Sequence, residues 1–191
     1  MSFKVFYSII LLNEIVPLEP ETKKFLKDKI QTAFYKKGSY LTRTGELCNR
    51  VFVLKKGLVR GYFVNNNKEI TTWISRENEM VTSISGYFKN KQGLENIQAL
   101  EDTYTEFLTF EDMHYSILHF PEMAAINRIL LEQYYISAEE RAFMARIPNA
   151  KDRFDFFVDS SHGHLLQRAP NKFLASLLGM RPETYSRVSK Q

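Results

Sequence analysis

A single cysteine, Cys48, occurs in the whole sequence. One thiol excludes a disulfide framework, and it excludes any zinc site or iron–sulfur cluster that needs several cysteine ligands. It is typical of a protein that works in the reducing cytoplasm. Histidine is scarce as well: there are four, and none precedes His114. The first half of the chain therefore lacks the imidazole ligands that zinc, copper and iron sites commonly use.

Long apolar runs are also missing, since no stretch approaches the ~20 apolar residues that span a membrane. The N-terminal segment 1–18 begins with an apolar run, but Asn13 and Glu14 interrupt it and no small-residue cleavage site follows. This pattern predicts a packing helix rather than a signal peptide. We therefore expect a cytoplasmic protein with no membrane partner.

Positive charge is concentrated at one end of the chain. Residues 141–191 contain nine Lys/Arg and four Asp/Glu, a net charge of +5, whereas residues 1–140 contain 17 and 18. The apolar fraction of 44% and the charged fraction of 25% are otherwise those of an ordinary globular protein. The asymmetry predicts an anionic partner for the C-terminal quarter.

The first 120 residues predict an antiparallel β-roll with flanking helices. Residues 21–34 have helical periodicity, and from Tyr35 to about Phe110 short strands alternate with glycine and asparagine turns. Residues 50–64 predict two strands joined as a hairpin at Lys56-Gly57. The fold class is therefore α+β, with an N-terminal roll of the cupin-like jelly-roll type.

One long helix is predicted for residues 121–146, ended by Pro148. Its apolar positions recur at intervals of three and four, as at Met123, Ile126, Leu130 and Met144. A helix of about 26 residues is about 39 Å long, which exceeds the width of so small a roll. The excess length favours the same helix of a second copy as its partner, so we expect a homodimer. The aromatic residues Tyr134, Tyr135 and Phe143 are expected to pack in the core.

Residues 171–190 predict two short helices around a sharp turn. Leu174 and Leu178 share one face before Gly179, and Tyr185 and Val188 share one face after it. Gly179 permits the left-handed conformation that ends a helix, and Pro182 suits the first turn of the next. This is the pattern of a helix-turn-helix whose polar, partly basic second helix enters the DNA major groove. A helical hairpin that only packs is the alternative.

The remaining C-terminal segment completes the predicted domain organisation. A short helix is expected after Pro148, followed by a break at residues 160–163 and a wing strand at Leu165–Arg168. The predicted parts are residues 1–120 (sensory roll), 121–147 (dimerisation helix) and 148–191 (winged helix-turn-helix).

This order of parts resembles the Crp/Fnr regulators over nearly the whole chain. The stretches that carry the resemblance are KGSYLTRTGELCNRVFVLKKGLVRGYF at residues 37–63, IQALED at 97–102 and QRAPNKFLASLLGMRPETYSRVSK at 167–190. The resemblance implies a roll of the cyclic-nucleotide-binding type, a dimer helix and a winged helix-turn-helix that binds a pseudo-palindromic DNA site.

The resemblance also implies which residues meet DNA. Glu183 and Arg187 match base-contacting positions, while Asn171 and Lys172 match phosphate-side positions. Arginine can donate two hydrogen bonds to guanine, and a carboxylate can accept one from cytosine. Arg181 stands where the family usually has a serine or threonine cap, and either a phosphate contact or no role is open for it. The full set of predicted DNA-binding residues is Asn171, Lys172, Arg181, Glu183, Thr184, Ser186, Arg187 and Lys190.

The effector site departs from the family. Members that bind cyclic AMP use a Gly-Glu pair and an arginine followed by a small hydroxyl residue, whereas residues 78–98 here contain neither. Lys89 and Lys91 are the cations of this stretch, and an ammonium is a poor substitute for the planar guanidinium fork. The roll has therefore lost the cyclic-nucleotide site or binds something else.

No cofactor or metal is expected, because the four histidines are best interpreted as ordinary surface residues. They are His114, His119, His162 and His164.

The leading hypothesis is a dimeric, sequence-specific transcription regulator with an altered effector pocket, and not an enzyme. Its expected partners are double-stranded DNA and a second copy of itself, with RNA polymerase as a further candidate and the effector unknown. The alternative is a cyclic-AMP-responsive sensor that still binds the nucleotide in its roll. An enzyme of the cupin type is a third class, but the roll lacks the histidine ligands that such enzymes use.

Overall fold

The computed structural model describes residues 6–89 and 91–190. The chain forms two compact units. The first unit contains the described residues up to Arg60, together with Ser75–Leu131. The second contains Gly61–Ile74 and the described residues from Glu132 onward. The chain passes between the units three times: two of these crossings lie within strands, and the third lies within the longest helix.

Eight strands form two four-stranded sheets, with the orders β1-β8-β3-β6 and β2-β7-β4-β5. The pairings of β8 with β1 and β3, of β3 with β6 and of β2 with β7 are antiparallel. This confirms the α+β class with antiparallel sheets. The strands are β1 (Gln31–Tyr35), β2 (Tyr40–Thr42), β3 (Arg50–Lys56), β4 (Val59–Asn65), β5 (Lys68–Ser75), β6 (Met80–Val81), β7 (Asn96–Ala99) and β8 (Thr103–Thr109).

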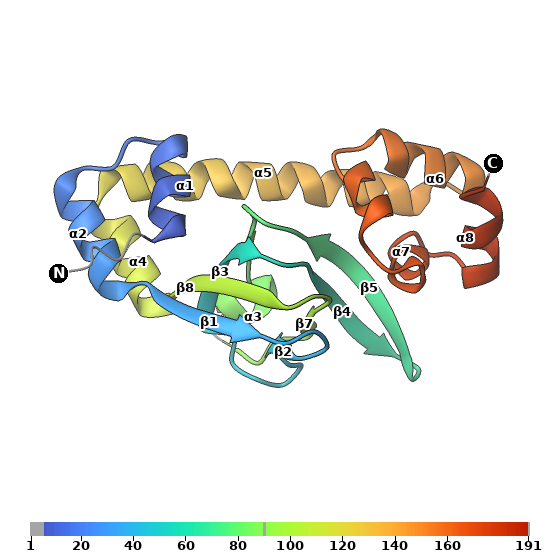
Figure 1. Ribbon diagram of the computed structural model, residues 1–191, viewed down its shortest axis with the longest axis horizontal. Helices are drawn as coiled ribbons and strands as arrows, with labels where there is room; N and C mark the ends of the chain where they lie inside the picture. Colours follow the sequence, from blue (N-terminus) through green and yellow to red (C-terminus); the bar gives the residue numbers. More distant parts are fainter. Residues whose placement is uncertain (1–5, 90, 191) are drawn as a thin grey trace. The chain divides into compact units, whose positions relative to one another are not determined.

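The helices include the predicted N-terminal helix and the predicted long helix. Figure 1 shows the long helix, α5, as one uninterrupted element. Proline at the first position of α5 and another just beyond its end define its bounds, which is why the sequence predicted them correctly. The helices are α1 (Tyr7–Ile15), α2 (Pro20–Lys29), α3 (Ile84–Lys89), α4 (Phe110–His119), α5 (Pro121–Arg146), α6 (Ala150–Asp159), the 3₁₀ helix η1 (Gly163–Gln167), α7 (Asn171–Leu177) and α8 (Pro182–Val188).

The helix predicted for residues 21–34 is too long. Helix α2 ends at Lys29, and the next residues form β1, which pairs with β8 in continuous register from Gln31↔Phe107 to Tyr35↔Thr103. Phe34 lies on the outer side of this pair, 46% exposed, with its ring centroid 4.7 Å from that of Tyr104. Pairing with a distant strand overrides the local helical periodicity.

The hairpin predicted at Lys56-Gly57 is wrong, although both strands exist. Strand β3 lies in the first sheet and β4 in the second. Gly57 has a φ of +113°, and a Cβ there would lie 2.4 Å from Thr103 Oγ1, so the chain makes a crowded corner between sheets. The tight hairpin instead joins β4 to β5 through Asn66 and Asn67, whose φ values of 49° and 61° suit a two-residue turn.

The first unit has its core where α5 begins. Leu26, Met123 and Ile126 are fully buried there, and Leu130 packs against the same cluster. Along α5, Met144 is buried as well, so the predicted stripe is the face that packs within the chain.

The opposite side of α5 is exposed and apolar, contrary to the core packing expected for its aromatic residues. Tyr134 is 39% exposed, Tyr135 is 70% exposed and Phe143 is 56% exposed. Leu131 and Ile136 are exposed next to them, at 40% and 56%. Leu131 and Tyr135 lie four positions apart and Ile136 and Phe143 seven, so these four residues share a broad helix face that the chain itself leaves uncovered, whereas Tyr134 points to its edge.

A buried carboxylate holds the start of α1. Glu106 of β8 is 3% exposed, and its two oxygens accept hydrogen bonds from Tyr7 N at 2.9 Å, Ser8 N at 2.8 Å and Ser8 Oγ at 2.6 Å. The N-cap residue of α1, Phe6, supplies no side-chain cap. Glu106 therefore does the work of an N-cap from a strand about a hundred residues away.

Replacing Glu106 is expected to destabilise the protein strongly. Glu106→Ala leaves three donors without their acceptor, and we expect a loss of about 3 kcal/mol of unfolding free energy. Glu106→Gln keeps one acceptor oxygen and is expected to lose less. Urea denaturation measures both, with Glu14→Ala, an exposed glutamate of α1, as the control. Equal midpoints for Glu106→Ala and the control would contradict this role.

Candidate nucleic-acid interface

The two short helices predicted near the C-terminus are present, and the turn between them has a defined geometry. Gly179 has a φ of +61°, its N–H donates to Ser176 O at 3.0 Å, and Met180 N donates to Ala175 O at 2.8 Å. These two bonds are those of a Schellman motif, which satisfies the last carbonyls of α7. The glycine is required because its left-handed backbone is costly for other residues.

Helix α8 packs through one face only. Tyr185 and Val188 are buried, and the Tyr185 ring lies edge-on against Phe154 of α6 with centroids 5.9 Å apart. Pro182 occupies the first helical position, and Arg181 is the N-cap residue without a side-chain cap bond. The first turn of α8 therefore lacks a side-chain N-cap, as the sequence predicts.

The predicted DNA-binding residues lie on or beside α7 and α8, away from their packed faces. Asn171 and Lys172 are the first two residues of α7, and the Lys172 Nζ lies 4.7 Å from the centroid of the Phe173 ring. Spacings of three, four and seven place several residues of α8 and its end on one face. All of the set are exposed except Thr184, which is half-buried: Asn171, Lys172, Arg181, Glu183, Thr184, Ser186, Arg187 and Lys190.

The predicted wing strand is wrong. Gly163–Gln167 form a 3₁₀ helix, in which Leu165 N donates to His162 O and Arg168 N donates to Leu165 O. Leu165 is 1% exposed, so it serves as a core residue of the second unit. No strand occurs among residues 150–190, so the segment has no neighbour to pair with.

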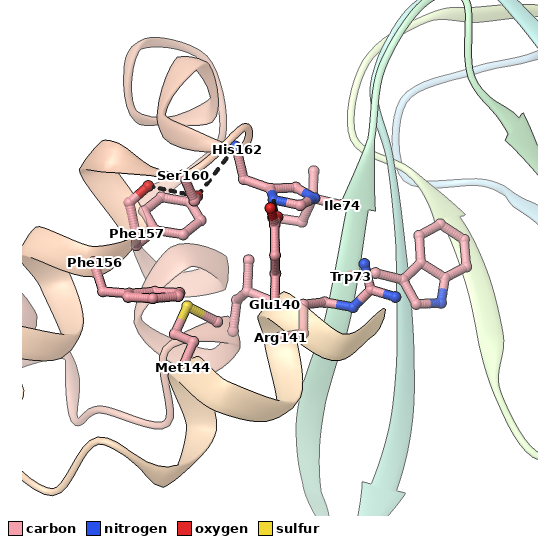
Figure 2. Close-up of a pocket in the computed structure, with 10 residues that line it drawn as sticks. Trp73, Ile74, Glu140, Arg141, Met144, Phe156, Phe157, Ser160 and His162 are labelled. Carbon is pink, nitrogen blue, oxygen red and sulfur yellow. Dashed lines mark hydrogen bonds and ion pairs between the residues drawn. The ribbon is translucent and has the colours of Figure 1, made fainter. Parts of the chain in front are cut away.

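A small cavity lies beside these helices, between β5, α5, α6 and α7. Figure 2 shows the His162 ring next to the Glu140 carboxylate, with Met144 and Phe156 on one side and Trp73 on the other. His162 Nδ1 lies 3.6 Å from Glu140 Oε2, and Ser161 Oγ donates to the same oxygen at 3.1 Å. Burial lowers the pKa of His162 below its ordinary value, and the charge of Arg141 lowers it further. His162 is thus a half-buried packing residue rather than a surface one.

The other two histidines that precede this region lie in α4, a helix that the sequence analysis missed. The His119 ring stacks on Tyr115 with centroids 3.8 Å apart, and His114 stacks on Phe110. No group of His, Cys, Asp or Glu able to hold a metal ion occurs among the described residues.

The stretch that departs from the family's effector site forms β6, α3 and β7. Lys89 ends α3 and Lys91 follows it, and both are exposed. A cavity of about 20 Å³ in the first unit is lined mainly by apolar side chains and by the Glu106 carboxylate. That volume holds about one water molecule, and the carboxylate would repel a phosphate.

Sequence reasoning missed a buried cation in the roll. Arg60 of β4 is 2% exposed, and its Nε and Nη2 donate to Gln98 Oε1 at 3.0 and 2.8 Å. Gln98 Nε2 in turn donates to Gly38 O at 3.1 Å. The signal was a lone arginine within the apolar strand pattern VRGYFV, and burial of a guanidinium requires such polar partners.

No described helix has the length and apolarity needed to cross a bilayer.

The fold, with antiparallel sheets, a long helix and a terminal pair of short helices, is similar to that of solved Crp/Fnr regulators. No protein-family model matches the sequence, and no curated protein matches it. The fold is similar to those of three solved regulators. Because the sequence identities are low, this similarity shows the fold alone. The three regulators are FixK2 from Bradyrhizobium japonicum (TM-score 0.72, 15% identity, 85% of this chain and 83% of that chain), the c-di-GMP-responsive global regulator CLP from Xanthomonas campestris (0.70, 14%, 90% and 90%) and the Catabolite Activator Protein from Thermus thermophilus (0.58, 22%, 94% and 85%). These neighbours are regulators rather than enzymes.

Proposed function

We propose that this chain is a dimeric, sequence-specific DNA-binding transcription regulator of the Crp/Fnr type. The observation that carries the proposal is the α7–α8 pair. Its buried face packs on α6, while its polar face stays exposed with Arg187 and Lys190 on it. The net charge of +5 on residues 141–191 supports a polyanionic partner for this end. Selection of bound sequences from random duplex DNA by the purified protein tests the proposal, and enrichment of one pseudo-palindromic motif is the expected result.

The proposed second partner is another copy of the chain, joined through α5. The exposed face of α5 carries Leu131, Tyr135, Ile136 and Phe143. These apolar side chains are removed from water only if another molecule covers them. A dimer also places two α8 helices against successive half-sites of one DNA face. RNA polymerase remains a candidate further partner, and regulation of chromosomal genes would place the protein in the cytoplasm.

The proposed effector pocket is altered rather than of the cyclic-AMP type. CLP, which has this fold, is described as responsive to c-di-GMP, so regulators of this architecture respond to other ligands. The alternative is that the roll still binds cyclic AMP. The buried Arg60 gives that alternative its best support, because it is a guanidinium inside the roll.

Isothermal calorimetry is expected to show no tight binding of cyclic AMP. Residues 78–98 supply neither a carboxylate after glycine nor an arginine, and their two lysines are exposed. Titration of the purified protein should therefore give little heat at micromolar ligand. A submicromolar Kd that Arg60→Met abolishes would establish the alternative instead.

A further inference from the structure

One hydroxyl joins the first helix of the α7–α8 pair to the second sheet. Thr71 N of β5 donates to Ser176 Oγ of α7 at 2.9 Å, across 105 positions of sequence. The Ser176 hydroxyl donates in turn to Glu69 O at 3.3 Å. Ser176 therefore binds two backbone groups of one strand, as another strand would.

The place of β5 in its sheet explains why a side chain can take this position. Strand β5 is last in the order β2-β7-β4-β5, so its outward backbone groups need a cover that is not a strand. Thr71 is 2% exposed and Ser176 is half-buried, so the contact is partly shielded from water. Next to it, Trp73 and Ile74 of β5 and Leu177 of α7 line the small cavity of Figure 2.

The hairpin of Gly61–Ile74 consequently belongs to the same compact unit as α7 and α8. The contact leaves the predicted DNA-binding side chains in water, since Lys172 and Arg187 are both exposed. A contact that blocked DNA would cover them. The hairpin thus holds the helix pair while keeping its polar face open.

We propose that Ser176 is a positioning residue for DNA binding, which fixes the helix pair against the Gly61–Ile74 hairpin. This inference rests on the proposed function. In a dimer, the spacing of the two α8 helices must match the spacing of two half-sites, about 34 Å. An anchored helix pair has fewer orientations to lose when it binds, which raises affinity and sharpens the preference for one spacing.

The first test measures the anchor without DNA. In Ser176→Ala, hydrogen exchange at the Thr71 amide is expected to quicken by about tenfold, the effect of losing one hydrogen bond. Emission from Trp73, the single tryptophan of the chain, is expected to change with it. Ser176→Thr keeps the hydroxyl and should behave as the wild type. The matched control is Thr72→Ala, which removes a hydroxyl bonded to Gly61 O within the hairpin itself. Unchanged exchange at Thr71 in Ser176→Ala would overturn the proposal.

The second test uses the selected DNA site and variants with one or two base pairs added between its halves. Ser176→Ala is expected to bind the selected site about three- to tenfold more weakly and to discriminate less between spacings. A merely destabilised protein would lose affinity for all these DNAs by one common factor, and that result would overturn the positioning role. Wild-type protein that binds no DNA would overturn the proposed function and the positioning role together, while the exchange data would still decide whether the anchor exists.

Discussion

The substitution Ile136→Asp is expected to convert the proposed dimer into a monomer and to weaken binding to the selected DNA about a hundredfold or more. Ile136 is 56% exposed and lies near Tyr135 and Phe143 on the uncovered face of α5. A carboxylate at this position would be desolvated in the dimer interface, with no opposite charge to compensate it. DNA affinity falls too, because two linked α8 helices bind with an effective concentration that a monomer lacks. Sedimentation velocity at micromolar protein and fluorescence anisotropy with labelled DNA measure the two effects.

Two other substitutions on α5 make the test specific. Gln133→Asp adds the same charge to an exposed position outside the apolar face, so it should leave the dimer intact. Leu130→Asp is unsuitable as a test of the dimer, because Leu130 packs against the core of the first unit and the variant is expected to unfold. If Ile136→Asp sediments as a dimer, the proposed interface lies elsewhere.

Local chemistry explains which parts of the fold were predictable. The turn between α7 and α8 depends on Gly179, Pro182 and four apolar positions within a short segment, and all were visible in the sequence. The ends of α5 were visible in the same way, through Pro121 and Pro148. The helical periodicity did not distinguish the face that packs within the chain from the one that it leaves exposed, because both faces are apolar.

The parts that failed depend on distant partners. Residues 31–34 join a strand because β8 pairs with them, and β3 and β4 separate because they belong to different sheets. Leu165 lies in a 3₁₀ helix instead of a wing strand because its side chain packs in the core of the second unit. The contacts of Ser176 with β5 and of Glu106 with α1 connect residues about a hundred positions apart. A local sequence pattern does not predict such pairs.

The candidate DNA-binding residues were predictable as an exposed set, because the helix pair needs its apolar positions for packing and leaves the rest to solvent. Their individual roles need a measurement that separates base contacts from phosphate contacts. Arg187 and Lys172 are suited to it, since both are exposed cations on different helices of the pair.

Arg187→Ala is expected to cost about 1–3 kcal/mol of binding free energy on the selected site and much less on random DNA. Arg187 lies in the last turn of α8, on the exposed side away from Tyr185 and Val188. A guanidinium there can donate two hydrogen bonds to guanine O6 and N7, which only some base pairs offer. Arg187→Lys keeps the charge without the planar fork, so it should restore affinity for random DNA but not the preference for the selected site.

Lys172→Ala should behave differently, because a phosphate contact carries no sequence information. We expect it to weaken selected and random DNA about equally and to reduce the salt dependence of binding by about one ion per subunit. Anisotropy titrations at several salt concentrations measure both variants on both DNAs. Equal losses on the two DNAs for Arg187→Ala would make Arg187 another phosphate contact. If neither substitution changes DNA binding, α7 and α8 form a helical hairpin that only packs, and the proposed function fails with them.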